Sequence, residues 1–345
     1  MPVRDWNDVK PGVFFYPKKT LLLGNGFNLA LLREEGLSYR RLKDGLNSQD
    51  FHIQESIKTE LENENNNFET LIRKLEEASR IAGVYGANSV EMDNDAIALR
   101  EGLAETISNL HPLQERIVAN GASRNCSRFL RKFSNIFTLN YDLLLYWVIL
   151  NESMEGKFKD GFGRSNPEGP LVWLNRDSQN IFYVHGALHL YKQLYENFDS
   201  DFLLGQSHFI YKLVRENGSL LEQVSDNINS GRYPFTVVEG NQTQKLQTII
   251  ENVYLRDCMD KLKKLVGEVY TFGWSASIPE DTHIIHALGA SKITKCFFGV
   301  RAGVNLVPIE EQFEIINARR RRESRDGLEL IFYNSDTAPV WRADG

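Results

Sequence analysis

Short apolar runs, each closed by a turn-forming or polar residue, recur along the chain and predict buried β-strands. Most runs are apolar on both faces, as Leu21, Leu22 and Leu23 show, which is typical of parallel strands covered by helices on two sides. The sequence therefore predicts a mostly parallel sheet. The expected strands span residues 20–23, 135–138, 181–184, 235–238, 269–272, 296–300 and 328–333.

Helical patterns fill the stretches between these strands. Asn66, followed three residues later by Glu69, is typical of a capping box at a helix start. The alternation of strand and helix predicts an α/β fold with a Rossmann-like, doubly wound sheet, in which ligands bind beyond the carboxyl ends of the strands. One expected helix has a clear apolar face, formed by Phe68, Leu71, Ile72, Leu75 and Ala78.

We expect residues 1–345 to form a single α/β domain with two insertions. The stretch between the first two core strands is too long for a simple crossover and carries mostly helical patterns. We therefore expect a helical insertion at residues 30–130. A second, mostly helical insertion is expected at residues 191–233.

Charge and cysteine content exclude several classes of protein. Forty basic and 46 acidic side chains give a formal charge of -6, which leaves no global electrostatic footprint for nucleic acid or an anionic membrane. Cys126, Cys258 and Cys296 lie far apart, so neither a disulfide framework nor a paired zinc motif is expected. No run of about 18 apolar residues occurs, and the opening residues lack the apolar segment of a signal peptide. We expect a cytoplasmic protein without a zinc module.

Small and polar residues follow four of the expected strands, and the first such segment is rich in glycine. Gly24 and Gly26 lie between a strand and a helical pattern, where they would let the backbone and the helix start approach a phosphate. Leu29 replaces the third glycine of the dinucleotide-binding fingerprint, and a simple tight turn between strand and helix explains the glycines equally well.

The second and third strand ends carry residues suited to catalysis. Asn140 and Asp142 follow the strand that ends at Thr138. Asp142 can simply cap the next helix, whereas Asn140 has no obvious structural task and is therefore the stronger functional candidate. His185, followed by Gly186, ends the third strand. A lone histidine is usually structural, but one at this edge of a sheet, with an ordinary pKa of about 6.5, suits proton transfer.

The fourth strand end carries Gly273 and Ser275, which are suited to contact a ribose or a phosphate. Asp281, a little further on, is explained as the cap of the next helix. The order of these segments, GNGFN at 24–28, TLNYD at 138–142, His185 with Gly186, and FGWS at 272–275, resembles the sirtuin series of glycine loop, QNID-type segment, HG and GTS.

The resemblance is closest to the divergent sirtuin-like proteins of bacterial anti-phage systems, including an uncharacterised branch with a similar segment from 238 through Lys245 to Cys258. It implies NAD as substrate, with the glycine loop at the diphosphate, His185 as base and Ser275 on the adenosine side. The catalytic residues so implied are Asn140, Asp142 and His185. The NAD-binding residues so implied are Gly24, Asn25, Gly26, Phe27, Asn28, Thr138, Gly273 and Ser275.

The activity that the resemblance implies is an NAD glycohydrolase that yields nicotinamide and ADP-ribose, acting in anti-phage defence by depleting NAD. Sirtuin deacylases hold a zinc module of two CxxC pairs, which the scattered cysteines here do not provide, so water is the expected acceptor. The pyridinium leaves as a neutral molecule and needs no general acid. The resemblance also implies a homo-oligomer and a regulatory partner such as a defence-system NTPase.

Other hypotheses come from different classes of protein. A non-catalytic module that senses NAD or an ADP-ribose nucleotide within a larger assembly fits the same motifs. The arginine run at 319–322, with Arg325, suggests nucleic acid, but its place at the end of a helical pattern favours a solvated helix terminus. His283 and His286 could share a metal on one helix face, but no third ligand is evident, so we expect no metal.

Overall fold

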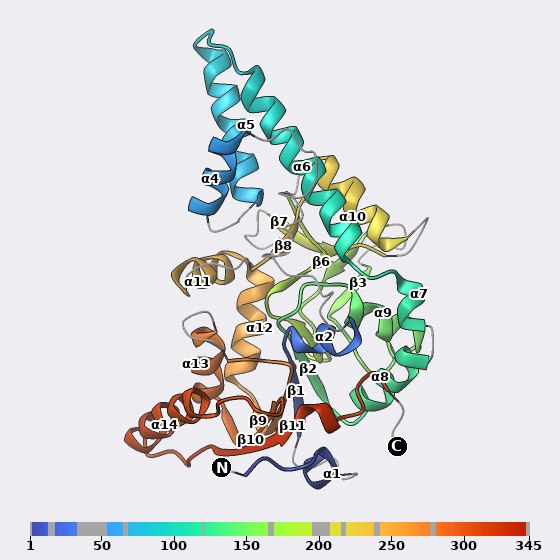
Figure 1. Ribbon diagram of the computed structural model, residues 1–345, viewed down its shortest axis with the longest axis vertical. Coiled ribbons are helices and arrows are strands. Elements are labelled where there is room, and N and C mark those ends of the chain that lie inside the picture. The colour runs from blue at the N-terminus through green and yellow to red at the C-terminus, as the bar shows by residue number, and fades with distance from the viewer. Residues whose placement is uncertain are drawn as a thin grey trace.

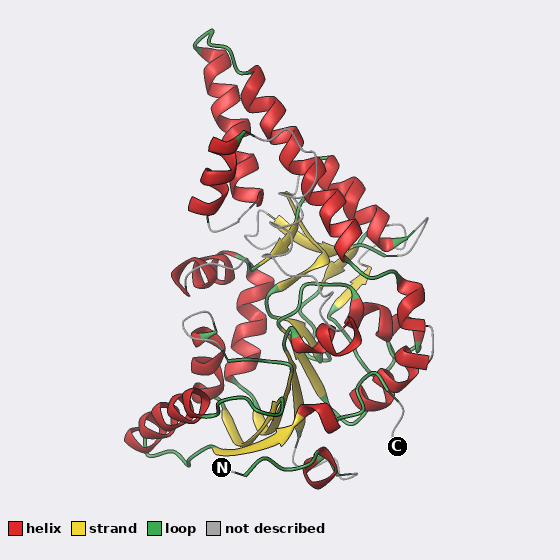
Figure 2. Ribbon diagram, viewed as in Figure 1, coloured by secondary structure: helices red, strands yellow, loops and turns green. Residues whose placement is uncertain are grey.

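The computed structural model describes residues 2–12, 18–32, 54–64, 68–118, 121–164, 169–194, 208–214, 219–237, 242–276 and 281–342. These residues form two β-sheets with helices around them and a long helical arm (Figures 1 and 2). Among the described helices, none combines the length and the apolar character that crossing a bilayer requires.

The central sheet has six strands, all parallel, so the predicted α/β class with a parallel sheet is confirmed. Its order is β11-β10-β9-β1-β2-β5, and the direction in which strands are added therefore reverses beside β1. All five residues of β1 are buried, as expected for a strand covered on both faces. The strands are β1 (Lys19–Leu23), β2 (Asn135–Thr138), β5 (Ile181–Tyr183), β9 (Val266–Phe272), β10 (Lys292–Val300) and β11 (Glu329–Asn334).

Helices lie on both sides of this sheet in Figure 1. On one side are α12 (Val253–Lys263), α13 (Thr282–Ala290) and α14 (Val307–Arg322). On the other are α8 (Ala122–Leu130) and α9 (Leu144–Asn151). Every residue of α9 from 144 to 149 is buried, because this helix is apolar on all faces and is enclosed by its neighbours.

Smaller elements complete the body of the molecule. The short helix α2 (Gly26–Leu32) follows β1 directly, and α11 (Gln242–Glu251) precedes α12. At the amino-terminal side, α1 (Trp6–Val9) and the 3₁₀ turn η3 (Ser335–Thr337) lie together, and Trp6 packs in the core against Phe129 and Tyr333.

A second sheet, antiparallel and five-stranded, was not predicted from the sequence. The expected strand near 235–238 belongs to it and pairs with β6, so its assignment to the parallel sheet is wrong. Among the described residues of 191–233, which we expected to be mostly helical, α10 (Leu220–Asn229) is a helix, and the stretch also carries the end of β6 and all of β7. The strands are β3 (Phe162–Arg164), β4 (Leu171–Trp173), β6 (Gly186–Leu194), β7 (His208–Lys212) and β8 (Pro234–Thr236).

The helical arm is formed by α5 (Phe68–Val84) and α6 (Val90–Leu110), which pack side by side and project from the body, with α10 along the base of α6 (Figure 1). In the sequence, helix α4 (Glu55–Asn63) precedes the arm and helix α7 (Gln114–Val118) follows it. Four of the five residues expected on the apolar face of α5 are buried, but Ala78 is exposed and the neighbouring Ser79 is buried instead. Asn66 of the expected capping box lies outside the described residues.

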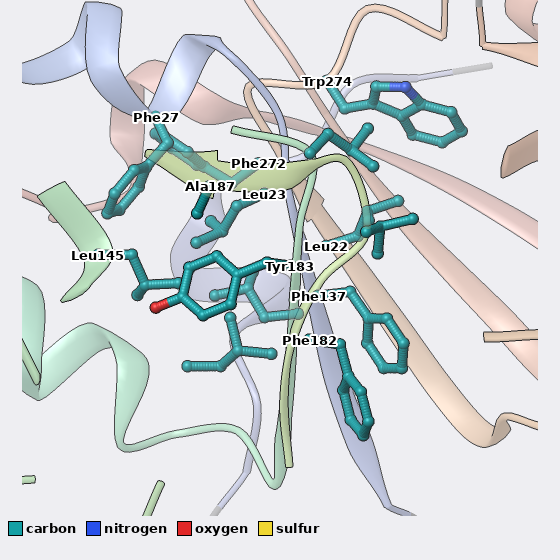
Figure 3. Close-up of a cluster of buried hydrophobic side chains, with 14 of the residues drawn as sticks. Leu22, Leu23, Phe27, Phe137, Leu145, Phe182, Tyr183, Ala187, Phe272 and Trp274 are labelled. Atoms are coloured by element: carbon teal, nitrogen blue, oxygen red, sulfur yellow. The ribbon is translucent and has the colours of Figure 1, made fainter. Parts of the chain in front are cut away.

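The core lies where β1, β2 and β5 meet the surrounding helices. Figure 3 shows part of it, with apolar side chains from these strands, from α2 and from α9 in one cluster. Phe137 of β2 and Phe182 of β5 stack at a ring-centroid distance of 4.4 Å. The carboxyl ends of the same strands carry the sequence-predicted site residues, so the core fixes the framework of the site.

Gly186 joins the two sheets. It begins β6 directly after β5 and has a backbone φ of +75°, a conformation that L-residues rarely adopt. A Cβ atom at this position would lie 2.0 Å from the Phe235 carbonyl oxygen in β8. The close approach of β8 therefore leaves room for glycine alone.

We expect Gly186→Ala to destabilise the protein by about 3 kcal/mol or more, because positive φ and steric overlap act together. Gly86→Ala is the matched control, since Gly86 has φ +69° but nothing within 4 Å of a Cβ atom, and it should cost only about 1 kcal/mol. Urea unfolding of both variants measures the difference. Equal losses would show that the contact with Phe235 is not a constraint.

Candidate functional site

Four loops that carry the predicted site residues meet at the carboxyl ends of adjacent strands. β1 pairs with β2 on one side and with β9 on the other, and β2 also pairs with β5. Leu23, the last residue of β1, is in register with both Thr138 and Phe272. The segments at 24–28, 138–142 and 273–275 and His185 therefore lie along one edge of the sheet although they are far apart in sequence.

The glycine loop after β1 packs directly against the loop after β9. The N–H of Gly26 donates to the Gly273 carbonyl at 2.8 Å, and the N–H of Gly24 donates to the Phe272 carbonyl at 3.0 Å. A Cβ atom on Gly26 would lie 2.5 Å from the Gly273 Cα, and Gly273 itself has φ +69°. The close backbone contact is therefore a structural reason for Gly24 and Gly26, in line with the alternative of a tight turn between strand and helix.

A chain of buried polar side chains connects the loop after β1 with the loop after β2. The Asn140 amide donates to the Gly24 carbonyl at 3.0 Å and to Asn28 Oδ1 at 3.3 Å, and the Asn28 amide donates to Asp142 Oδ2. The Thr138 hydroxyl accepts the Asn140 N–H at 3.1 Å. The expectation that Asn140 has no structural task is therefore wrong, because its amide ties the β2 loop to the glycine loop.

Asp142 is fully enclosed, and burial raises the pKa of its carboxyl from 3.8 to about 6. Hydrogen bonds from the Leu144 N–H, at 2.8 Å, and from Asn28 act in the opposite direction because they favour the carboxylate. Leu144 is the first residue of α9, so Asp142 also serves the start of this helix, as the capping hypothesis suggested.

His185 is buried, and its nearest polar partner is a second histidine. Its Nε2 lies 2.9 Å from Nε2 of His283 in α13, and the two rings are 5.1 Å apart at an interplanar angle of 30°. The pKa of His185 is well below 6.5, first because of burial and then because of His283 and Lys245 in α11. A hydrogen bond with the Leu139 backbone acts in the opposite direction.

The sequence did not assign His283 to this site. It appeared only as one half of a possible metal pair with His286, but His286 is exposed and His283 is buried, so the two do not share an environment. The one signal that pointed to His283 is its place in the first turn of the helix that follows β9. Within the described ranges, no group of three or more His, Cys, Asp or Glu residues is placed to hold a metal ion.

The remaining predicted NAD-binding residues differ in their surroundings. Asn25 and Ser275 are exposed, and both are accessible to a ligand. Phe27 is buried against Trp341, with ring centroids 4.7 Å apart, while the Trp341 indole N–H donates to the Phe27 carbonyl. The side chain of Phe27 is therefore part of the core.

The arginine run at 319–322 has a structural function at its second residue. Arg320 is buried and donates to the carbonyls of Leu288, Gly289, Ser291 and Ile293, which closes the end of α13. Arg319 and Arg325 pair with Glu323. These contacts favour the helix-terminus interpretation of the run over nucleic-acid binding.

A cavity of about 410 Å³ lies away from the strand ends, at the edge of the sheet between β11, α14 and the amino-terminal segment. Arg4, Phe313 and Leu330 are among its lining residues, and none of the residues predicted to bind NAD lines it. The candidate site is therefore assigned by the convergence of the loops rather than by cavity volume.

The raised pKa of Asp142 predicts a pH-dependent stability. Because its folded-state pKa exceeds 3.8, the folded protein binds this proton more tightly, and its contribution to the free energy of unfolding falls as pH rises from about 4 to about 6. The fall is at most about 3 kcal/mol. Asp142→Asn removes the ionisation, so in urea unfolding the stability advantage of the parent over this variant should shrink across the window. Asp326→Asn, at an exposed position, is the control. An advantage that stays constant from pH 4 to 7 would contradict the assignment.

Comparison with known proteins places the chain in a family. No curated protein matches it. The family model described as "Domain of unknown function (DUF4917)" matches residues 21–341, a span that includes the four strand-end loops and both sheets. The chain therefore belongs to the DUF4917 family.

Proposed function

We propose that the protein is a divergent, sirtuin-like NAD glycohydrolase that cleaves NAD to nicotinamide and ADP-ribose, in anti-phage defence by NAD depletion. The observation that carries the proposal is the convergence of the four loops beside the reversal of strand order. Numbered along the chain, the parallel strands have the order 6-5-4-1-2-3. This is the order of doubly wound dinucleotide-binding sheets, whose ligands lie in the crevice where the order reverses.

In the proposed reaction, different residues of the site bind the diphosphate, orient the ribose and accept a proton. The exposed backbone around Asn25 would lie at the diphosphate, and His185 and Asn140 at the nicotinamide ribose. Burial keeps His185 neutral near pH 7, so its imidazole can accept a proton from water or a ribose hydroxyl. The Asn140 amide nitrogen holds the glycine loop, and no described residue donates to its Oδ1, which can therefore orient a hydroxyl or the attacking water.

A second candidate function is a sensor that binds NAD or an ADP-ribose nucleotide without cleaving it. The contact of the glycine loop with Gly273 and the bond between His185 and His283 favour it, because both engage groups that catalysis would need. Chromatography of NAD after incubation with the protein separates the two functions, since a sensor returns NAD intact.

We expect His185→Ala to lower nicotinamide release by about 10²- to 10⁴-fold, the range for loss of a general base. Asn140→Ala should also nearly abolish release, because the loop and the orienting oxygen are lost together. His286→Ala is the matched control, since its imidazole is exposed on the same helix as His283. Chromatographic product analysis measures all three. Folded His185→Ala and Asn140→Ala variants that hydrolyse NAD at the parent rate would refute this catalytic pair.

We expect Asn25→Asp to weaken NAD binding about fivefold, because a near-isosteric carboxylate would repel the diphosphate. Gly26→Asp is a poorer test, since its side chain would collide with Gly273 whether or not NAD binds there. Asn7→Asp adds the same charge in α1 and serves as control. Isothermal titration with NAD reports the affinities, and equal affinity of Asn25→Asp and parent would remove the diphosphate from this loop.

A further inference from the structure

We propose that Lys245 and His283, beside His185, form a binding site for a phosphate group. The three side chains come from separate elements: Lys245 from α11, His185 from the junction of β5 and β6, and His283 from α13. Helix α11 packs against both α12 and α13, and Lys245 acts electrostatically on His185. His185 and His283 are in direct contact through their Nε2 atoms.

Lys245 is a buried ammonium group that has no partner among the described residues. Only 6% of this residue is exposed, and within the described ranges its side chain forms neither an ion pair nor a hydrogen bond. Burying a charged group in this state is unfavourable unless an opposite charge compensates it. The residues known to act on His185 are themselves cationic or neutral, so the compensating charge is not supplied by them.

Two other inward-facing lysines in the described part of the chain differ from Lys245. Lys19 is buried to a similar extent, and its ammonium group donates to the Gly12 carbonyl at 2.7 Å. Lys212 forms an ion pair with Asp160 and lies over the rings of Tyr146 and Phe162. Both of these lysines have partners, and the lack of one for Lys245 among the described residues points to a ligand.

The donor set selects a phosphate group over other anions. An ammonium group has three N–H donors, and an imidazole that is protonated on the nitrogen facing the phosphate adds a further donor from a different direction. A phosphate offers several acceptor oxygens in a tetrahedral arrangement, and it forms strong charge-assisted bonds with such donors. A carboxylate has only two oxygens, and a chloride ion has no preferred geometry.

The identity of the phosphate rests on the proposed function. If His185 acts at the nicotinamide ribose, the group nearest to Lys245 is the phosphate on that ribose, while the glycine loop is left for the phosphate on the adenosine side. Binding at Lys245 does not require hydrolysis, so the two proposals can be tested separately.

The test compares parent, Lys245→Met and Lys264→Met, the last removing an exposed lysine as control. Thermal unfolding and titration calorimetry are carried out with inorganic phosphate, with ADP-ribose and with chloride at matched ionic strength. We expect phosphate and ADP-ribose, but not chloride, to stabilise the parent and the control. Lys245→Met should weaken both ligands by about 10- to 100-fold, the effect of one charge-assisted hydrogen bond.

The ligand-free state provides a second readout. Lys245→Met should raise the unfolding temperature without ligand, because an unpaired buried charge is replaced by an apolar side chain of similar length. A merely structural lysine would give the opposite result. His283→Gln, which keeps one amide donor, should lower phosphate affinity without abolishing it.

The outcomes separate the sources of the phosphate and the two proposals. Tighter binding of ADP-ribose than of inorganic phosphate supports a nucleotide ligand, and equal binding supports a free phosphate; both support the site. Phosphate binding that Lys245→Met leaves unchanged, or stabilisation of the parent by chloride alone, overturns it. A protein that binds phosphate through Lys245 but leaves NAD intact keeps this inference and refutes the glycohydrolase.

Discussion

The contact between Gly26 and Gly273 is the constraint on which the candidate site depends. Two backbones meet there without side chains between them, at the point where the order of strands reverses. The N–H of Gly26 is bonded to the Gly273 carbonyl, which fixes the start of α2 relative to the end of β9. Larger residues at either position would push the two loops apart, and the side chains that these loops carry would no longer converge.

The polar residues extend this constraint to the loop after β2 and to the start of α9. Asn140 holds the glycine loop, Asn28 holds Asp142, and Asp142 holds the start of α9. A buried network of this kind stabilises only when its members are satisfied together, because each unpaired polar group would be costly. The same residues that resemble catalytic positions in the sequence are therefore also structural, and a variant at Asn140 or Asp142 reports on both roles.

The sequence predicted what depends on local pattern and missed what depends on distant pairing. Strand β1 could be predicted from the sequence because Leu21 to Leu23 are apolar and buried on both faces of the sheet. The second sheet could not be predicted, because β3, β4 and β8 are only three residues long, and β4 and β8 pair with strands that are remote in sequence. The polar strand ends were located from sequence, but the bond from His185 to His283 joins residues 98 positions apart and has no local signature.

Two buried histidines, His111 and His185, differ in the groups that hold their imidazole rings. His111, at the end of α6, accepts the Leu143 N–H on Nε2 at 3.0 Å, so its Nδ1 carries the proton that is shared with the Pro112 carbonyl. Burial lowers its pKa to about 4, and the neutral tautomer is fixed by two backbone groups that cannot exchange roles. This bond anchors the helical arm to the loop of Asp142.

His185 instead faces another imidazole. Its Nε2 lies 2.9 Å from Nε2 of His283, so one of these two nitrogens donates and the other accepts, and the contact couples the tautomer of one ring to that of the other. Backbone groups hold both ring nitrogens of His111, whereas His185 is held by the Leu139 backbone and by a second side chain, His283. That difference, together with its position at a strand end, is the reason why the proposed reaction is assigned to His185 and not to His111.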